Sequence, residues 1–316
     1  MSNRLRNPAI LAFTSVVWGL AFVAQSKGGE TVDPYLFNAV RFTAAALLLY
    51  ALMPLFSKLG LAEKRPVFVG GEVRKTTIRA GIVTGVFLSI ASNLQQAAIS
   101  MGAPAGKAGF LTACYMLFVP LFNFVIFRKR LGVNILLAVG IAVAGMYLLC
   151  LTRGGSWRKE DLLLLLCAVV FSFQILSIDR FSGKTDPIRF AALEFLVAGL
   201  LSFIPSCFTA FGRAGFAATV SSLTTPDALL CLGYAAVFSS AVGYTLQIVG
   251  QRGVDPTVAG IIMSLESVFS ALAGWLILRQ TLNGRQIAGC AMIFAGVVLA
   301  QLDLPALSSR RDPGRS

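Results

Sequence analysis

The sequence contains ten apolar runs, each about as long as a helix that crosses a membrane. Such a helix needs about 20 predominantly apolar residues to cross the hydrocarbon core of a bilayer. Only 13% of the residues are charged, about half of the share in a typical soluble domain, because charged side chains are costly in lipid. The pattern therefore predicts an all-α integral membrane protein with ten transmembrane helices. The runs cover residues 7–27, 34–57, 77–100, 104–127, 131–151, 161–181, 187–208, 227–250, 256–278 and 284–302.

The two halves of the chain repeat each other in sequence. A shift of 151 residues aligns most of one half with the other without gaps, and a shift of 153 residues aligns the earlier part of the first half with the earlier part of the second. Chance similarity between apolar segments explains shared Val, Leu and Ala, but not polar, Gly, Pro and Arg matches that hold register over several helices. The repeat also favours a membrane helix over a signal peptide for the first run. Matched pairs include Gln96 and Gln247, Gly102 and Gly253, Arg128 and Arg279, and Asp33-Pro34 and Asp186-Pro187.

Each half holds five of the runs, and we predict two repeats over residues 7–151 and residues 159–302. An odd number of crossings forces the second repeat to enter the membrane from the opposite side. Inverted repeats of this kind are typical of secondary transporters, in which the two halves rock about a site near the midplane. The repeat therefore indicates alternating access.

The net charge of +13 indicates membrane orientation rather than nucleic-acid binding, because Lys and Arg lie mostly between the apolar runs. If the N-terminus is inside, 18 of these residues fall in inside segments and eight in outside segments. The bias predicts a multi-pass protein of the cell membrane, inner or plasma, with both termini in the cytoplasm. The chain has no Asn-x-Ser/Thr sequence, which is compatible with a bacterial source.

Two polar stripes lie at equivalent positions in the third and eighth runs, with residues spaced by 4, 3 and 4 on one helical face. Polar groups in hydrocarbon need partners or water. The stripes therefore either line one cavity or hold neighbouring helices together by hydrogen bonds. We favour the cavity, because the stripe recurs in both halves while its residue types differ. The stripes are Ser89, Asn93, Gln96 and Ser100, and Ser240, Tyr244, Gln247 and Gln251.

Trp18 lies in the middle of the first run rather than at a membrane interface, and its equivalent in the sixth run, Phe171, precedes Ser172. An indole at mid-membrane suits stacking on a ligand, or packing in the protein core. Glu266 lies ten residues after Pro256, which places it about 15 Å deep in the ninth run. Its carboxyl can exchange protons, bind a cationic group, or serve as a hydrogen-bonded structural residue.

Arg41 and Glu194 are equivalent in the repeat, and each lies seven residues after a proline. Each is therefore about 10 Å inside its own face of the membrane, and the two faces are opposite. A direct ion pair between them is not expected. We interpret both as gating or structural charges, with the structural role favoured.

The composition disfavours several functions. The chain has no histidine and no Asp-rich loop, which argues against a His-based metal site and a lipid-modifying membrane enzyme. It has no GxxxxGK[ST] loop, so an ATP-driven pump in one chain is not expected. We predict no cofactor and no metal, with proton coupling as the energy source if Glu266 titrates.

Four loose motifs occur in an order that resembles the EamA-type branch of the drug/metabolite transporter superfamily, over residues 8–302. The resemblance implies ten helices, cytoplasmic termini, and export or exchange of small metabolites such as amino acids or drugs. It places the substrate cavity among the first, third, fourth, sixth, eighth and ninth helices. The motifs are Trp18-Gly19, Arg41-Phe42, the stretch from Gly109 to Pro120 with the following residues 145–149, and the stretch from Ser264 to Leu278 with residues 287–289 and 296–299.

The sequence departs from this family at two places. Ser267 follows Glu266 where the family usually has proline, and Arg279-Gln280 closes the ninth helix where the family usually has Gly-Glu. Any coupling or gating attributed to that second glutamate is therefore not expected here.

Together these observations predict a secondary transporter, most simply an exporter, of a small metabolite, amino acid or drug-like solute. The alternatives are a membrane enzyme, or a channel or structural membrane subunit. The expected partners are a small-molecule substrate and the lipid bilayer, with no nucleic acid, and the expected state is a monomer or homodimer. The predicted substrate-binding residues are Trp18, Asn93, Gln96, Tyr115, Ser172, Tyr244, Gln247 and Glu266.

Overall fold

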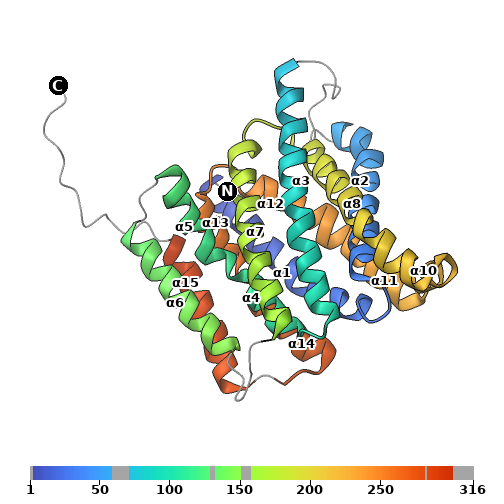
Figure 1. The fold of residues 1–316 in the computed structure, drawn as a ribbon. Helices are drawn as coiled ribbons and strands as arrows, with labels where there is room; N and C mark the ends of the chain where they lie inside the picture. The colour runs from blue at the N-terminus through green and yellow to red at the C-terminus, as the bar shows by residue number, and fades with distance from the viewer. Residues whose placement is uncertain (1–2, 59–70, 129–131, 151–157, 282, 302–316) are drawn as a thin grey trace, which may run out of the picture.

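The computed structural model describes residues 3–58, 71–128, 132–150, 158–281 and 283–301. The regular elements in this part of the chain are helices, which confirms the predicted all-α fold (Figure 1). The elements are α1 (Asn3–Gly28), α2 (Pro34–Lys58), α3 (Gly71–Ser100), α4 (Ala105–Ala113), α5 (Tyr115–Phe127), α6 (Val133–Cys150), α7 (Lys159–Ser182), α8 (Pro187–Ser206), the π-helix η1 (Cys207–Phe211), α9 (Gly212–Ala214), α10 (Phe216–Leu223), α11 (Pro226–Tyr234), the π-helix η2 (Ala235–Tyr244), α12 (Thr245–Gly250), α13 (Pro256–Met263), α14 (Glu266–Leu278) and α15 (Gly284–Gln301).

Eight helical stretches in the described ranges are long and apolar enough to cross a membrane, and they coincide with eight of the ten predicted runs. The other two runs form shorter apolar helices, Val133–Leu148 and Gly284–Ala300. Residue 131, which begins a predicted run, and residues 151 and 302, which end predicted runs and repeats, lie outside the described residues.

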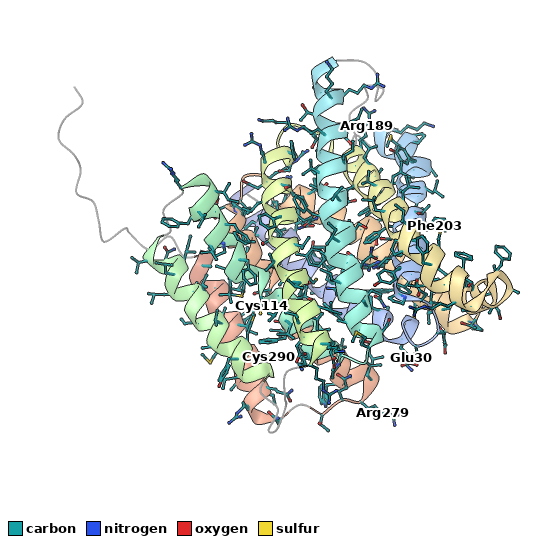
Figure 2. All side chains as sticks on the ribbon, viewed as in Figure 1. Glu30, Cys114, Arg189, Phe203, Arg279 and Cys290 are labelled. Atoms are coloured by element: carbon teal, nitrogen blue, oxygen red, sulfur yellow. The ribbon has the colours of Figure 1, made fainter. Side chains whose placement is uncertain are left out.

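The outer surface of the helices is rich in large apolar side chains, as lipid contact requires. Leu230 is 75% exposed, and Phe203 points away from the helices, whereas Cys114 lies among them (Figure 2). Figure 2 shows Arg189 at one end of the bundle and Arg279 at the opposite end.

Asp-Pro sequences begin three of the helices. The carboxylates of Asp33, Asp186 and Asp255 accept hydrogen bonds from backbone N–H groups in the first turns of α2, α8 and α13. At the other end, α5 and α14 each stop at an arginine in the left-handed conformation, with φ of 53° at Arg128 and 54° at Arg279. These two arginines are equivalent under the shift of 151 residues.

Two of the membrane-length stretches are interrupted at equivalent places. The stretch Ala105–Ile126 breaks at Cys114, between α4 and α5, and the stretch Pro256–Leu278 breaks at residues 264–265, between α13 and α14. Tyr115 and Glu266 are therefore the first residues of α5 and α14, and they are equivalent under the shift of 151 residues. The breaks place this pair inside the bundle at the start of a helix.

Helices that are equivalent in the repeat pack against each other across the two halves. α2 lies along α8, and α6 lies along α15 (Figure 1). The stretch of α4 and α5 packs on its equivalent, the stretch of α13 and α14, with α4 against α14 and α5 against α13. The contact of α6 with α15 is close, because Gly145 lies against the backbone of Gly289, and its equivalent Gly296 lies against the backbone of Ala138. α3 packs on α7, and their equivalents, α12 with η2 and α1, also pack together.

Candidate functional site

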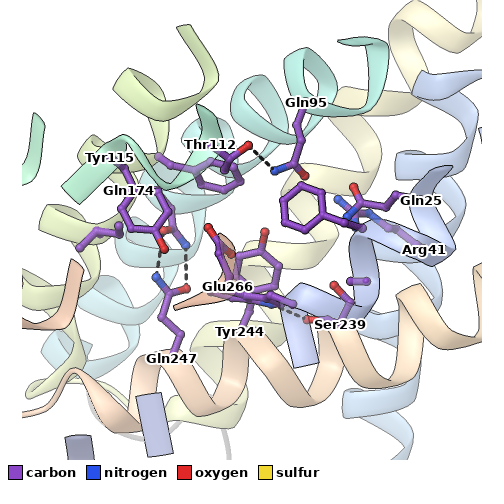
Figure 3. A pocket seen from close by; sticks show the side chains of 15 residues that line it. Gln25, Arg41, Gln95, Thr112, Tyr115, Gln174, Ser239, Tyr244, Gln247 and Glu266 are labelled. Atoms are coloured by element: carbon purple, nitrogen blue, oxygen red, sulfur yellow. Dashed lines mark hydrogen bonds between the residues drawn. The ribbon is translucent and has the colours of Figure 1, made fainter. Parts of the chain in front are cut away.

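A narrow cavity lies between the two halves, at the meeting point of α1, α2, α3, α4, α5, α7, η2, α12 and α14 (Figure 3). The cavity volume is about 30 Å³, room for only a few water molecules. A metabolite can therefore enter only if the lining side chains or helices move apart. The lining residues are Trp18, Ala21, Phe22, Gln25, Arg41, Gln95, Thr112, Tyr115, Phe171, Gln174, Ile175, Ser239, Tyr244, Gln247 and Glu266.

The first helices of the two repeats, α1 and α7, contribute equivalent positions to this lining. Helical spacing puts residues three and four apart on one face, so each helix presents a row of side chains to the cavity. The chemistry differs between the rows, because polar Gln174 in α7 is the equivalent of apolar Ala21 in α1. The equivalent pairs are Trp18 and Phe171, Ala21 and Gln174, and Phe22 and Ile175.

Glu266 and Tyr115 face each other inside the cavity. Glu266 is 4% exposed, and it stands in the first turn of α14, where the partial positive charge of a helix N-terminus favours a carboxylate. Among the described residues, neither Glu266 Oε1 nor the Tyr115 hydroxyl makes a hydrogen bond of ordinary geometry. The predicted mid-membrane carboxyl therefore lines the cavity with hydrogen-bonding capacity to spare.

Arg41 projects from α2 into the same cavity and is 1% exposed. Its guanidinium carbon lies 4.4 Å from the ring centroid of Phe42 and 6.0 Å from that of Phe37, so the charge rests against aromatic faces. In the described part of the chain, Nε and Nη2 of Arg41 have no hydrogen-bond partner, and no carboxylate lies within ion-pair distance. The structural role favoured from the sequence places Arg41 near an interface, whereas here it faces the cavity.

Glu194 lies behind the cavity rather than in its lining. Its Oε1 accepts a hydrogen bond of 3.0 Å from Gln174 Nε2. Gln174 and Gln247 also bond to each other in both directions, at 3.3 and 3.2 Å, and both line the cavity (Figure 3). Gln174 therefore connects the buried carboxylate of Glu194 to the wall of the cavity.

Trp18 is held against the π-helix η2. Its indole Nε1 donates a hydrogen bond of 3.1 Å to the carbonyl of Ser239. The approach is close because Gly243, one turn further along η2, has no side chain beside the indole. The Trp18 ring also lies 4.7 Å from the Tyr244 ring, measured between centroids. The indole therefore forms one wall of the cavity, as the ligand-stacking interpretation requires, and it is also packed firmly.

Three predicted binding residues lie outside the lining. Asn93 is part of a hydrogen-bond network with Asn38, Ser89 and Ser202, which ties α3 to α2 and α8. Gln96 donates to the backbone carbonyl of Gln25, which ties α3 to α1.

Ser172 is also outside the lining and bonds back to the carbonyl of Val169 in its own helix. The hydrogen bonds of Asn93 and Gln96 in the α3 stripe agree with the alternative interpretation, in which polar residues hold neighbouring helices together.

Five polar lining residues did not appear among the predicted site residues: Gln25, Gln95, Thr112, Gln174 and Ser239. Gln95 Nε2 donates to Thr112 Oγ1 at 3.1 Å, which closes one side of the cavity (Figure 3). Gln25 shared a helical face with Trp18 in the sequence, and Gln95 adjoins Gln96. Their polar character inside apolar runs was the available signal.

Comparison with known proteins places the chain in a family. The sequence model of the EamA-like transporter family matches residues 7–151 and 158–302. An uncharacterized transporter of Archaeoglobus fulgidus is 24% identical over 292 residues, which cover 92% of this chain and 84% of the relative. The uncharacterized inner membrane transporter YedA of Escherichia coli (strain K12) is 25% identical over 292 residues, 91% of this chain and 88% of the relative.

A probable amino-acid metabolite efflux pump of Salmonella typhimurium is 24% identical over 288 residues, 90% of this chain and 91% of the relative. A solved crystal structure has the same fold, with a TM-score of 0.70 and 18% identity, over 93% of this chain and 96% of the other. The family match extends over both halves of the sequence and agrees with the apolar helices of the fold. The chain therefore belongs to the EamA-like transporter family and is a membrane transporter.

Proposed function

We propose that the chain is a secondary transporter that exports a small metabolite across the cell membrane by alternating access. One observation carries this proposal: a polar and aromatic cavity lies where the two repeated halves meet, and among the described residues the Arg41 and Glu266 side chains in its lining each have buried polar atoms without a hydrogen-bond partner. Rocking of the halves about this cavity would open it to one side of the membrane at a time. The export direction follows the printed name of the Salmonella relative.

The proposal includes ten membrane crossings in two inverted repeats, residues 7–151 and 159–302. Three features support it: equivalent helices pair across the halves, the breaks before Tyr115 and Glu266 are equivalent, and Arg128 and Arg279 end equivalent helices in the same conformation. Arg189 and Arg279 lie at opposite ends of the bundle, as this topology requires (Figure 2). With the charge bias of the sequence, the topology gives an inner-membrane protein with both termini in the cytoplasm.

We also propose that Glu266 couples transport to protons. A buried carboxyl that binds either a proton or a cationic group of the solute makes the two compete for one site. Inward proton movement would then drive outward solute movement. The titratable side chains close enough to Glu266 to interact with its charge are those of Tyr115, Tyr244 and Cys167.

The test is solute flux in liposomes that contain the purified full chain, after a thermal-shift screen against a metabolite library. We expect saturable flux that is accelerated when unlabelled solute is placed on the opposite side, because a carrier returns faster when it is loaded. Flux proportional to solute concentration, with single-channel currents, would instead indicate a channel. No flux and no stabilisation by any solute would reject the proposal.

A further inference from the structure

One ion pair joins the two repeated halves near an end of the bundle. Lys107 belongs to α4 in the first half, and Asp161 belongs to the first turn of α7 in the second half. The Lys107 Nζ lies 2.6 Å from Oδ1 and 2.7 Å from Oδ2 of Asp161. The Lys107 side chain is 30% exposed and the Asp161 side chain 4%, so the pair stands where the interior of the bundle meets its surface.

This pair lies between the cavity and that end of the bundle. α4 and α7 pack against each other, and both contribute to the cavity lining. Thr112 is the lining residue of α4, five residues past Lys107, and Phe171 is the first lining residue of α7, ten residues past Asp161. At about 1.5 Å per residue, the pair is about 8 Å from the lining along α4 and about 15 Å from it along α7. Parting α4 from α7 at this end would therefore separate the two charges.

The two partners are held differently. The Asp161 carboxylate also accepts a hydrogen bond of 3.1 Å from the backbone N–H of Arg158, which fixes it at the start of α7. Lys107 has a flexible four-carbon stem and a compact, strongly hydrated ammonium. When the helices part, the ammonium can move into water while Asp161 keeps its contact with α7. The pair can therefore break and form again without unfolding either helix.

The repeat holds no second copy of this pair. Under the shifts that align the halves, Val258 on α13 is the equivalent of Lys107, and Pro8 on α1 is the equivalent of Asp161. α1 and α13 also pack against each other, but these two side chains cannot form an ion pair. In the proposed inverted topology, equivalent contacts lie at opposite ends of the bundle. The two conformers, each open at one end, therefore differ in energy by this ion pair.

We propose that Lys107 and Asp161 form a latch that holds one end of the cavity closed and favours opening at the other end. In the proposed topology α4 and α7 both start at the outer face of the membrane. The latch therefore closes the outer end, and the resting protein opens towards the cytoplasm, where an exporter collects its solute. This inference rests on the proposed function and adds the contact that sets its resting state.

The chain contains a native reporter beneath the latch. Cys167 lies six residues past Asp161 on α7, is fully buried, and lies beside Thr112 of the cavity lining. A small, charged, membrane-impermeant methanethiosulfonate can reach this thiol from the outer face only when the outer end is open. The full chain is treated in right-side-out and in inverted membrane vesicles. Mass spectrometry of the Cys167 peptide under non-reducing conditions then gives the rate of modification from each face.

Lys107→Met keeps the length of the side chain and removes its charge. We expect it to raise the rate of Cys167 modification from the outer face about two- to five-fold, because a partly exposed ion pair shifts an equilibrium by about that factor. From the cytoplasmic face the rate should not rise. Lys107→Arg keeps the charge and should stay close to the parent rate. The matched control is Lys27→Met, which removes the charge of an exposed lysine in the last turn of α1 and should leave both rates unchanged.

Salt gives a second readout that needs no substitution. Salt at about 1 M screens charges that are partly exposed to water. It should therefore speed outer-face modification of Cys167 in the parent chain and have no such effect in Lys107→Met, which has no pair to screen. An equal effect of salt on the two chains would contradict the latch.

Three further results would overturn the inference. They are equal outer-face rates for Lys107→Met and the parent chain, a rise of equal size from both faces, which indicates general loosening, and a Cys167 that stays unmodified from both faces in every variant. Failure of the proposed function gives a different result, because the labelling then changes as expected while liposomes show no saturable flux. Conversely, saturable flux with labelling that is unaffected by Lys107→Met retains the transporter and rejects the latch.

Discussion

Replacing Gly243 by alanine should disturb the cavity through a single residue, Trp18. A methyl group built at Gly243 would lie 2.6 Å from Trp18 Nε1, 3.2 Å from Trp18 Cδ1 and 3.3 Å from the carbonyl oxygen of Phe238. Ordinary carbon contacts begin near about 3.5 Å, so the indole must retreat by about 1 Å. Because the indole donates to Ser239 O at 3.1 Å, a movement of this size removes the hydrogen bond.

The expected loss of stability follows from these contacts. Overpacking of a core position costs about 1–3 kcal/mol, and a buried N–H group without a partner costs about 1–3 kcal/mol. Alanine is favoured over glycine in a helix by about 1 kcal/mol, which offsets part of the loss. We therefore expect a net destabilisation of about 1–5 kcal/mol. Solute affinity should fall as well, since the displaced indole forms a wall of the cavity.

The measurement is thermal unfolding in detergent together with solute binding and liposome flux. Gly233→Ala is the matched control, because Gly233 lies on the same membrane-length stretch and an added methyl group there meets nothing within 4 Å. In a double-mutant cycle, Trp18→Phe should reduce the cost of Gly243→Ala, since the smaller ring leaves room for the methyl group. Equal stability and equal affinity for Gly243→Ala and Gly233→Ala would refute the reasoning.

Three further changes have outcomes that the structure specifies. Glu266→Gln should abolish the dependence of solute flux on an imposed pH gradient while exchange of labelled for unlabelled solute continues, and a variant that retains the full response would remove Glu266 from proton coupling. Arg279→Gly should raise the melting temperature, with a gain of about 1 kcal/mol, because the φ of 54° strains any residue with a side chain; an unchanged or lower melting temperature would contradict this. Lys107→Gln should change stability by less than about 1 kcal/mol, since Lys107 is partly exposed in its ion pair with Asp161. Asp161→Asn should lower the melting temperature more than Lys107→Gln does, because Asp161 also accepts a hydrogen bond from the backbone N–H of Arg158 and so caps the start of α7. Equal melting temperatures of the two variants would argue against this capping role of Asp161.

The helices could be predicted because their signals are local. An apolar run of sufficient length gives the helix, and the Asp-Pro sequences at residues 33–34, 186–187 and 255–256 give three of the helix starts. The breaks at Cys114 and at residues 264–265 were not predicted, because neither break is marked by Pro or Gly. Their effect on the site is large, since Tyr115 and Glu266 begin the helices that follow.

The cavity lining was predicted in part. Trp18, Tyr115, Tyr244, Gln247 and Glu266 line it, as expected of a set chosen for polar or aromatic character within the membrane.

The spacing of polar residues could not predict which face of α3 is turned towards the cavity. A polar stripe shows that its residues share one face of the helix, but it does not show which neighbour that face contacts. Gln95 faces the cavity, whereas its neighbour Gln96, about 100° away around the helix, bonds to α1. In the eighth stretch, the π-helix η2 changes the number of residues per turn. Ser239 therefore lines the cavity, although the predicted stripe contained Ser240.

The repeat itself explains why a nearly symmetric scaffold can hold an asymmetric site. Tyr115 and Glu266 occupy equivalent positions that meet in the cavity, and one is neutral while the other is a carboxyl. Arg41 and Glu194 are also equivalent, but Arg41 faces the cavity while Glu194 is bonded to Gln174 behind it. Each pair therefore leaves one ionisable side chain in the lining, a guanidinium from one pair and a carboxyl from the other. In the proposed alternating-access cycle, duplication would provide the paired helices that open in turn, and divergence at these two pairs of positions gives the cavity its different ionisable groups.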